Sequence, residues 1–391
     1  MRVLHVQKLG GVAGSERYLL EILPALRAAG VDARFAALVT DADRARNDEM
    51  YRRLRAANVP FDVLPLGRAP RPSDVLGLAR LVRHQEVEIL HTHLVHADFV
   101  GALARPLLPK GVARVSTKHG YEESYINQYG FDPHRVPNNA YRTACWAAET
   151  QVTASYAISH GLQRLFVESG IARRDMEVIH YGFDFPPAFM QPQAEHRLGS
   201  PQIVMVGRLV GFKGHRYALE AMVRVRRDHP TAKLVIVGSG PLESAIRASI
   251  ASLDLAENVV MTGYRTDAAA FMAASDVALV PSISEGLGVV FLEAHAAGVP
   301  IVAFDVPASN EILRHGESGL LVPPYDIDAY ARQIIGLLSD QALREHLRTG
   351  GAERLRSYFT RERMTRETIS FYERALRRVR GHLRNGGTVA A

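Results

Sequence analysis

The sequence predicts an α/β protein built from two doubly wound parallel sheets. Two sets of short apolar runs, rich in β-branched residues, alternate with helical patterns, and a proline-rich stretch separates the sets. The length of 391 residues suits two domains of ordinary size. A hydrophobic fraction of 47% and a charged fraction of 23% are typical of a globular protein with large buried cores.

The first set of strands lies in the N-terminal part of the chain. Its apolar runs are Val3–Val6, Ala33–Val39, Phe61–Leu64, Ile89–His93, Ala113–Thr117 and Tyr156–Ile158. Helical patterns at Glu16–Ala29 and Asp74–Arg83 fall between these runs. Such alternation predicts a parallel sheet, because each crossover between parallel strands needs a helix-sized connection.

The second set repeats the same alternation further along the chain. Its runs are Ile203–Val206, Lys233–Val237, Val259–Met261, Asp276–Val280, Ile301–Ala303 and Leu320–Val322. The proline-rich and polar stretch Pro186–Pro201 is the expected linker. We therefore expect one Rossmann-like domain over residues 1–185 and a second over residues 186–365.

Each half begins with a strand, a glycine-containing loop and a helix. In the first half the loop carries Gly10, Gly11 and Gly14. Their spacing does not match the Gly-x-Gly-x-x-Gly pattern of a dinucleotide site. In the second half Arg208 and Lys213 lie in the loop after the first strand. Two cations at a strand end suit a diphosphate, although isolated surface charges are the simpler interpretation of such a pair.

The segment 281–300, PSISEGLGVVFLEAHAAGVP, is a glycine-rich turn between a strand and a short helix. Free backbone N–H groups at such a helix N-terminus favour an anion, and the expected donors are Gly286, Leu287, Gly288 and Val289. Glu285 and Glu293 are two acceptors eight positions apart, suited to sugar hydroxyls. The segment therefore suits a phosphorylated sugar. The simpler alternative makes Glu285 a first-turn helix charge and Glu293 a solvated residue.

Five elements of the second half resemble the nucleotide-sugar domain of family 4 retaining glycosyltransferases. They are VGRLVGFKG at 206–214, VIVGSGPLE at 235–243, VVMTGYR at 259–265, SDVALVPSISEGLGVVFLEAHAAGVPIVA at 275–303 and NEILRHGESGLLVPPYD at 310–326. The first half resembles the family more loosely, through GGVAGSE at 10–16, HTHLVHAD at 91–98, STKHG at 116–120, AISHG at 157–161 and VIHYGFD at 178–184. The resemblance implies a GT-B fold, in which two Rossmann-like domains face each other.

The resemblance also implies roles for individual residues. Arg208 and Lys213, beside Gly207, would hold the donor diphosphate. Glu293 would accept ribose hydroxyls and Glu285 would face the donor sugar. The remaining expected contacts are the backbone of Leu287, Gly288 and Val289 at the sugar or its phosphate, Tyr264 and Arg265 at the base, Gly11 in the loop near phosphate and acceptor, and His119 near the anomeric centre.

The implied reaction transfers a sugar from a nucleotide sugar, by default a UDP-sugar, to an acceptor hydroxyl with retention of configuration. No cofactor is expected. The acceptor, a sugar, a lipid-linked compound or a small molecule, stays open, as does the oligomeric state. Alternatives are a GT-B epimerase or phosphorylase, or a basic nucleic-acid-binding α/β protein, whose aromatic and zinc-finger signatures are missing. His180 and Tyr181 depart from the Pro and Asn of many relatives, so the acceptor side is expected to differ.

Two groups of residues resemble metal sites, and neither is expected to hold a metal. His91, His93 and His96 lack a clear fourth ligand. Asp326 and Asp328 form an Asp-x-Asp pattern, but they precede a helical stretch, where aspartate is a common cap. A cation is unnecessary if Arg208 and Lys213 neutralise the diphosphate. The single cysteine, Cys145, excludes an internal disulfide and is expected in the core.

The C-terminal segment 366–391 is expected to form a basic amphipathic helix that, in the GT-B fold, packs back on the first domain. Its apolar stripe is Ile369, Tyr372, Leu376, Val379 and Leu383, and its basic residues are Arg374, Arg377, Arg378, Arg380 and Arg384. A second possibility is that the arginines meet anionic lipid. The net charge of +6 fits phosphate-bearing ligands or such a membrane surface. Without a signal-peptide pattern or a long apolar run, we expect a cytoplasmic protein, at times at the inner face of the cell membrane.

Overall fold

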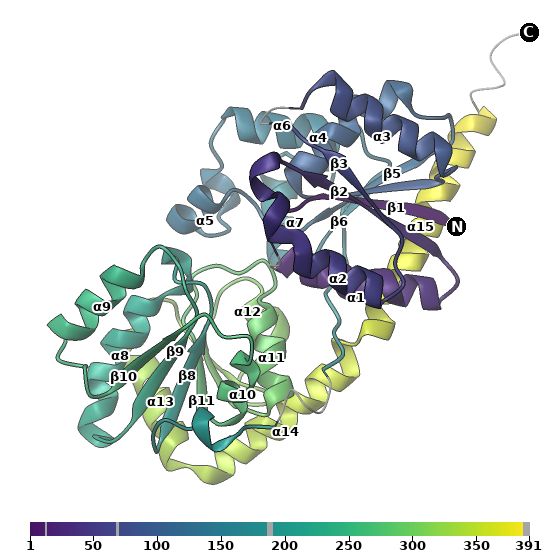
Figure 1. Cartoon of the computed structure of the whole chain (residues 1–391). Helices are drawn as coiled ribbons and strands as arrows, with labels where there is room; N and C mark the ends of the chain where they lie inside the picture. The colour runs from purple at the N-terminus through teal and green to yellow at the C-terminus, as the bar shows by residue number, and fades with distance from the viewer. Residues whose placement is uncertain (12–13, 68–69, 186–190, 386–391) are drawn as a thin grey trace, which may run out of the picture. The chain divides into compact units, whose positions relative to one another are not determined.

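The computed structural model describes residues 1–11, 14–67, 70–185 and 191–385, which fall into two compact units (Figure 1). Unit 1 comprises Met1–Glu122, Asp132–Gly182 and the segment from Arg361 onward, and unit 2 comprises Glu123–Phe131 and Phe183–Thr360. Each unit is a parallel sheet with helices on its two faces, as the sequence predicts. The first part of the expected linker, 186–190, lies outside the described residues.

The sheet of unit 1 has seven parallel strands in the order β3-β2-β1-β4-β5-β6-β7. The strands are β1 Arg2–Lys8, β2 Asp32–Val39, β3 Phe61–Pro65, β4 Ile89–His93, β5 Ala113–Lys118, β6 Ala154–Ala157 and β7 Glu177–Val178. All six predicted strands are present within a few residues of their expected bounds. Strand β7 is not predicted from the sequence, because two residues are too few to show a period.

The two faces of the unit 1 sheet carry different side chains, because residues alternate along each strand. Its helices are α1 Gly14–Ala28, α2 Asp48–Ala56, α3 Pro72–His84, α4 Leu94–Ala104, α6 Ala140–Glu149, α7 His160–Glu168 and α15 Arg361–Asn385. Leu4 and Val6 of β1 pack in one apolar cluster with residues of α3 and α4. Because successive side chains of a strand point to opposite faces, His5 and Gln7 lie on the other side, the side of α1 and α15.

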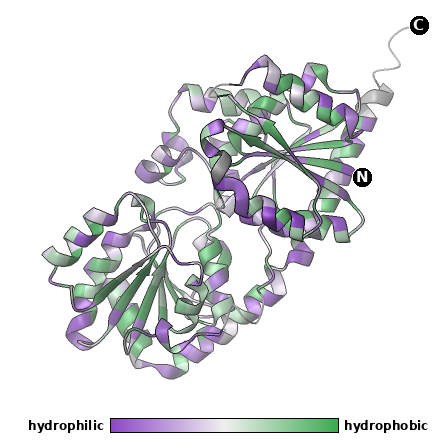
Figure 2. Cartoon of the chain, in the orientation of Figure 1, coloured by the Kyte–Doolittle hydropathy of each residue, from purple (hydrophilic) through white to green (hydrophobic). Residues whose placement is uncertain are grey.

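The sheet of unit 2 has six parallel strands in the order β10-β9-β8-β11-β12-β13. The strands are β8 Gln202–Val206, β9 Lys233–Val237, β10 Val259–Gly263, β11 Val277–Val280, β12 Ile301–Phe304 and β13 Leu320–Val322. The helices are α5 Glu123–Tyr129, α8 His215–Asp228, α9 Glu243–Ser252, α10 Ala268–Ala273, α11 Val289–Ala297, α12 Ser309–Ile312, α13 Ile327–Ser339 and α14 Gln341–Tyr358. The strands are the most continuous hydrophobic segments in Figure 2, as expected for a sheet covered on both faces.

Both sheets have a point where the strand order reverses. In unit 1 this point lies between β1 and β4, and in unit 2 it lies between β8 and β11. Connections leave adjacent strands in opposite directions there and open a crevice at the carboxyl ends of the strands. The glycine loop after β8 and the glycine turn after β11 therefore lie side by side in unit 2.

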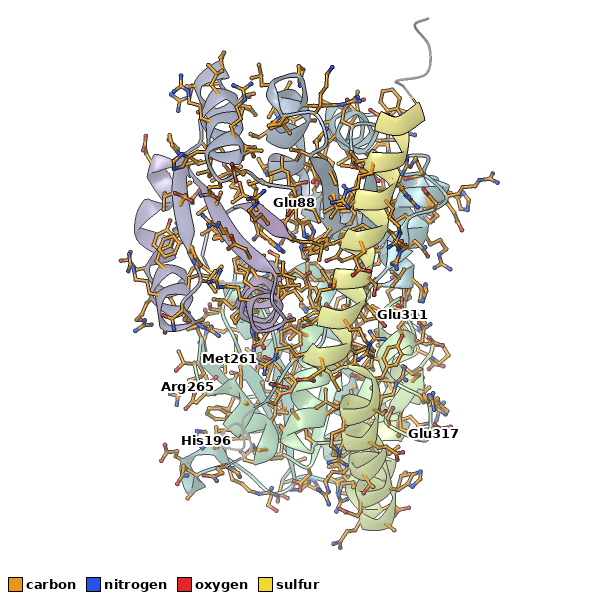
Figure 3. All side chains as sticks on the ribbon, turned by 90° about the vertical axis from the view of Figure 1, so that its right-hand side faces the viewer. Glu88, His196, Met261, Arg265, Glu311 and Glu317 are labelled. Carbon is orange, nitrogen blue, oxygen red and sulfur yellow. The ribbon has the colours of Figure 1, made fainter. Side chains whose placement is uncertain are left out.

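Helix α15 belongs to unit 1 and covers the face of its sheet that carries His5. Phe371 and Tyr372 are fully buried. Arg374 pairs with Glu177 of β7, and Arg378 lies 3.2 Å from Asp175. Glu88, labelled beside α15 in Figure 3, is 3.9 Å from Arg380. Tyr372 and Leu376 of the apolar stripe are therefore buried against the protein, and Arg374, Arg378 and Arg380 lie near acidic side chains. Among the described helices, none is both long and apolar enough to span a membrane.

Candidate functional site

The loops after β8, β9 and β10 are joined to one another at the carboxyl edge of the unit 2 sheet. Gly207 N donates to Val237 O at 3.0 Å, and Gly238 N donates to Gly263 O at 2.8 Å. Gly238 has a φ of 147°, and a Cβ atom there would lie 1.9 Å from Gly207 O. Only glycine permits this approach. The edge is therefore lined by backbone, which lets a ligand approach closely.

The loop after β8 carries the two predicted cations. Arg208 is exposed, and Lys213 ends a short 3-10 turn, Gly211–Lys213, that leads into α8. Gly214 follows with a φ of 77°, and a Cβ atom there would lie 1.9 Å from Pro281 O. Gly214 thus permits close packing of the β8 loop against the β11 turn, which brings Lys213 to that turn.

The turn after β11 holds a buried carboxylate beside the lysine. Lys213 Nζ donates to Glu285 Oε1 at 2.6 Å, and Ser282 Oγ donates to the same oxygen at 2.7 Å. The Glu285 side chain is 7% exposed and that of Lys213 is 16% exposed. The structure therefore joins two residues that are 72 positions apart in sequence. Ser282 was not among the predicted residues, because a serine in a polar turn carries no distinguishing signal.

Helix α11 starts directly after this turn. Gly288 precedes it in a left-handed conformation with a φ of 83°, and Val289 is its first residue. Gly286 is partly exposed while Leu287 is buried. Glu293 lies within α11, eight residues after Glu285, and is partly exposed. The helix N-terminus contributes positive backbone charge at the point where Lys213 lies, so the crevice suits an anion.

A second serine of the turn, Ser284, was also missed by the sequence analysis. It is 1% exposed, and its Oγ has no hydrogen-bond partner among the described residues. Burying an unpaired hydroxyl costs about 1–3 kcal/mol. An unpaired polar atom in a ligand-binding turn makes Ser284 a candidate contact for a bound molecule.

Tyr264 and Arg265 follow β10, at the edge of the sheet. Tyr264 is 72% exposed. Arg265, labelled in Figure 3 near Met261 of β10, forms a two-pronged pair with Asp267 at 2.8 and 2.6 Å. Strand β9 lies between β10, which these residues follow, and the crevice at β8 and β11. Their position suits the end of an extended ligand that starts at Lys213.

Helix α5 is a part of the site that the sequence analysis placed elsewhere. The chain before and after it belongs to unit 1, but residues 123–131 group with unit 2. Asn127 Oδ1 accepts from Phe212 N at 3.0 Å, and Glu123 lies 3.3 Å from Arg208. These contacts hold α5 on the β8 loop. Their partners are about 85 positions away in sequence, so no local pattern reveals them.

His119 and Gly11 are the predicted site residues of unit 1. His119 follows β5, and both of its ring nitrogens are occupied, by His93 at 2.9 Å and by the hydroxyl of Tyr181. Burial lowers the pKa of His119 to about 3, so the ring is neutral at pH 7. Gly11 has a φ of 118° and its N–H donates to Asn47 Oδ1 at 3.1 Å.

Two family models together cover most of the chain. One, described as Glycosyltransferase Family 4, matches residues 12–185, and the other, described as Glycosyl transferases group 1, matches residues 188–354. The chain belongs to the family 4 glycosyltransferases.

Individual relatives resemble this family 4 chain in different portions. An N-acetyl-alpha-D-glucosaminyl L-malate synthase of Bacillus anthracis is 26% identical over 77% of this chain and 78% of its own length. An exopolysaccharide phosphotransferase of Streptomyces coelicolor is 42% identical, but over only 36% of this chain and 15% of its own length. The solved structure of Anabaena HepE with UDP-glucose has a TM-score of 0.78 at 21% identity and covers 95% of this chain and 99% of that one. The structural likeness shows the GT-B fold.

The histidine group of this glycosyltransferase differs from the predicted one. His5, His91 and His93, and not His96, have ring nitrogens within 4.8 Å of one another. The strand register explains why His5 takes the place of the predicted His96, because His5 of β1 lies opposite His91 of β4. All six ring nitrogens of this trio already have protein partners: His93, Tyr372, Thr117, His119 and His5. The arrangement favours a hydrogen-bonded group over a metal centre.

The Asp-x-Asp pair lies at the start of α13. Asp326 Oδ1 accepts from Ala329 N at 2.9 Å, and Asp328 pairs with Arg224 of α8. Asp326 is therefore a helix cap, as expected. Cys145 is buried, and burial raises the pKa of its thiol to about 12.

We expect Asp326→Ala to lower the free energy of unfolding of unit 2 by about 1 kcal/mol and to leave activity intact, because it removes one cap hydrogen bond. Asp340→Ala is the matched control, since Asp340 caps α14 in the same way through Leu343 N at 2.9 Å. Urea denaturation and an activity assay with and without chelator compare the two. Loss of activity in Asp326→Ala alone would show that Asp326 holds a metal.

Proposed function

We propose that unit 2 binds a nucleotide-sugar donor at the crevice between β8 and β11, and that the enzyme transfers the sugar to an acceptor hydroxyl with retention of configuration and without a metal ion. One observation carries the proposal. Lys213 and Glu285 are held together, largely buried, at the N-terminus of α11. This places a cation and an anion-binding helix end next to an acceptor for sugar hydroxyls.

The diphosphate would lie at the cationic side of the crevice. Departure of a nucleoside diphosphate leaves negative charge on the leaving oxygen, and stabilising that charge is the main catalytic task. Lys213 is shielded from water, so its charge acts through a lower effective dielectric than that of an exposed side chain. Arg208 and the N–H groups around Gly288 and Val289 would complete the neutralisation. A metal ion is therefore unnecessary in this arrangement.

The carboxylates would bind hydroxyl groups. Glu285 Oε1 accepts hydrogen bonds from Lys213 and Ser282, and these two hydrogen bonds lower its nucleophilicity. We therefore assign Glu285 to the donor sugar as a ligand, in a same-face displacement without a covalent glycosyl intermediate. Glu293, further along α11, would accept from the ribose. The exposed Tyr264 and the backbone near Arg265 would lie against the base.

UDP is the nucleotide we propose. The structurally similar HepE was solved with UDP-glucose, and the glycine-lined edge of unit 2 runs from β8 past β9 to β10. In unit 1, Gly11 and His119 would serve the acceptor and the reacting sugar. The acceptor class stays open, and so does peripheral membrane contact through the exposed arginines of α15.

A ligand screen tests the proposal directly. Thermal unfolding is followed with UDP, GDP, ADP and their sugar conjugates, and transfer or hydrolysis of a bound sugar is followed by release of the nucleoside diphosphate. We expect UDP and a UDP-sugar to raise the melting temperature. The absence of any shift with every nucleotide would refute a nucleotide-sugar site, and turnover without an acceptor or with inorganic phosphate would favour an epimerase or phosphorylase.

Replacing Lys213 tests the assigned charge. We expect Lys213→Ala to lower kcat/KM for the donor by about 100- to 1,000-fold, because it removes a positioned stabiliser of the leaving group. Arg247→Ala is the control, since it removes an exposed cation from α9 of the same unit. Steady-state kinetics on both variants make the comparison. Equal activity of the two variants would remove Lys213 from the proposed site.

A further inference from the structure

Unit 1 contains a continuous chain of hydrogen-bonded side chains that ends at His119. It runs through Tyr181, His119, His93, His5, Tyr372, His91 and Thr117. The distances are 2.9 Å from His119 to His93, 3.0 Å from His93 to His5 and 3.1 Å from His5 to Tyr372. Tyr372 lies 2.7 Å from His91, which lies 2.7 Å from Thr117. The chain therefore links the C-terminal helix to the predicted active-site histidine.

The parallel register of the sheet brings these residues together. His5 of β1 pairs with His91 of β4, and His93 pairs with Thr117 of β5. Side chains two positions apart on a strand share a face, so His91 with His93, and Thr117 with His119, point to the same side. Helix α15 covers this side and inserts Tyr372 between His5 and His91.

The four rings are neutral in this environment. His5, His91 and His93 are fully buried, and the chain contains no carboxylate. Two imidazolium rings cannot hydrogen-bond to each other, because both nitrogens of each are donors. A neutral ring has one N–H donor and one bare acceptor nitrogen. A ring that accepts from the residue before it must therefore donate to the residue after it, and the direction of donation is the same along the whole chain. All four histidines must then share one tautomer, either Nδ1–H or Nε2–H.

Thr368 of α15 is the group through which one of the two directions can be set. Its Oγ1 donates to Met364 O at 2.8 Å, so toward other partners it acts as an acceptor. Tyr156 is hydrogen-bonded to Thr368, Thr117 and Tyr18. If the Tyr156 hydroxyl donates to Thr368, Thr117 is left to donate to Tyr156. Thr117 then accepts from His91, and the direction of every later link follows.

We propose that Thr368 and Tyr372 of helix α15 are positioning residues for His119, and that they fix it in the Nε2–H tautomer with Nδ1 accepting from the Tyr181 hydroxyl. In this direction His119 donates to His93, His93 to His5, His5 to Tyr372, Tyr372 to His91 and His91 to Thr117. The C-terminal helix thus acts on the site of unit 1 through hydrogen-bond direction. The catalytic consequence rests on the proposed function, while the tautomer itself does not.

Histidine-selective ¹⁵N labelling and long-range ¹H–¹⁵N NMR test the assignment, because they distinguish a protonated ring nitrogen from a bare one. Signals are assigned with single substitutions such as His119→Gln and His93→Gln. We expect His5, His91, His93 and His119 all to be neutral and protonated on Nε2. Different tautomers within the group, a shared Nδ1–H form, or loss of these signals on tight binding of added Zn²⁺ would each overturn the proposal.

Two variants test the role of α15. Tyr372→Phe interrupts the chain, and Thr368→Val removes the acceptor that sets its direction. In each we expect the ratio of Nε2–H to Nδ1–H at His119 to fall about five- to tenfold, which is the bias of roughly one hydrogen bond. Thr368→Val keeps shape and volume, so it remains informative if Tyr372→Phe folds poorly. An unchanged ratio at His119 in Thr368→Val would refute the assigned direction.

Tyr330→Phe is the matched control. Tyr330 is also fully buried on a helix and donates one hydrogen bond, to Val302 O at 2.9 Å, but it lies in unit 2. We expect this variant to leave the His119 signals unchanged. For sugar transfer, Tyr372→Phe should lower kcat about tenfold with little change in donor KM, as for loss of orientation. Absence of transfer in the unmodified enzyme would refute the proposed function and leave the tautomer result standing, so the two failures are distinguishable.

Discussion

The free energy of unfolding of unit 1 is expected to fall by about 5 kcal/mol for each pH unit below about 6.5, because the buried His5, His91 and His93 and the partly buried His119 are neutral in the folded protein. Burial lowers the pKa of His5 and of His119 to about 3. It also lowers the pKa of His91 and of His93 well below the usual value, with neighbouring imidazoles adding to the effect.

The direction of the pH effect follows from proton binding. In the unfolded chain each histidine has a pKa near 6.5, so between pH 6.5 and about 3 the unfolded state binds protons that the folded state does not. The stabilisation that comes from keeping these four histidines neutral is fully present above about pH 6.5. It is lost as the pH falls toward the pKa values of the folded state. Since a domain has about 5–15 kcal/mol in total, unit 1 should unfold within one to three pH units of this point.

Urea denaturation at several pH values, followed by a probe in unit 1, measures the slope. His91→Phe should reduce the slope by about 1.4 kcal/mol per pH unit, because it removes one proton from the linkage. His134→Gln is the control, since His134 is an exposed histidine of unit 1 and should leave the slope unchanged. A slope near zero in the unmodified protein would contradict neutral buried rings and the hydrogen-bond chain drawn from them.

Lys118→Met is expected to destabilise unit 1 by about 3–5 kcal/mol, because it leaves two buried carboxylates without their cation. Lys118 Nζ lies 2.7 Å from Asp98 and 2.9 Å from Glu149, and the three side chains are at most 5% exposed. The pair of carboxylates holds the pKa of Lys118 above its ordinary value despite burial. Lys118 is thus a structural cation on the sheet face opposite His119.

The measurement is the free energy of unfolding by urea, with Lys110→Met as the control. Lys110 is an exposed lysine of unit 1, and its replacement should change stability by no more than about 0.5 kcal/mol. Adding Asp98→Asn and Glu149→Gln to Lys118→Met should recover much of the loss, since it removes the unpaired charges. A loss below about 1 kcal/mol in Lys118→Met would show that the carboxylates are protonated or hydrated.

Much of the fold could be predicted from local patterns. The six predicted strands of each half are present, since apolar runs of β-branched residues between helical patterns identify buried parallel strands. The last helix could be recognised by its apolar stripe, but that stripe omitted Phe371, which is fully buried. Helix α5 could not be assigned to unit 2, because its partners Phe212 and Arg208 are far away in sequence.

Some residues of the candidate site could be predicted from the sequence. Arg208, Lys213 and Glu285 were chosen by motif, and the strand order places their loops next to each other. The Lys213–Glu285 contact could not be predicted, because it depends on the close approach of Gly214 to Pro281. The assignment of each residue to sugar, ribose or diphosphate remains a prediction that the proposed variants test.

The sequence by itself determined the two parallel sheets, their strands and the loops that carry charge and glycine at strand ends, because period and turn chemistry are local properties. Only the tertiary structure decided which distant side chains meet. The register of β1 and β4 puts His5, and not the predicted His96, beside His91 and His93. Tyr372 of α15, near the other end of the chain, hydrogen-bonds to this histidine group. Such contacts depend on how separate strands and helices pack together, and the local pattern of any one segment does not determine that packing.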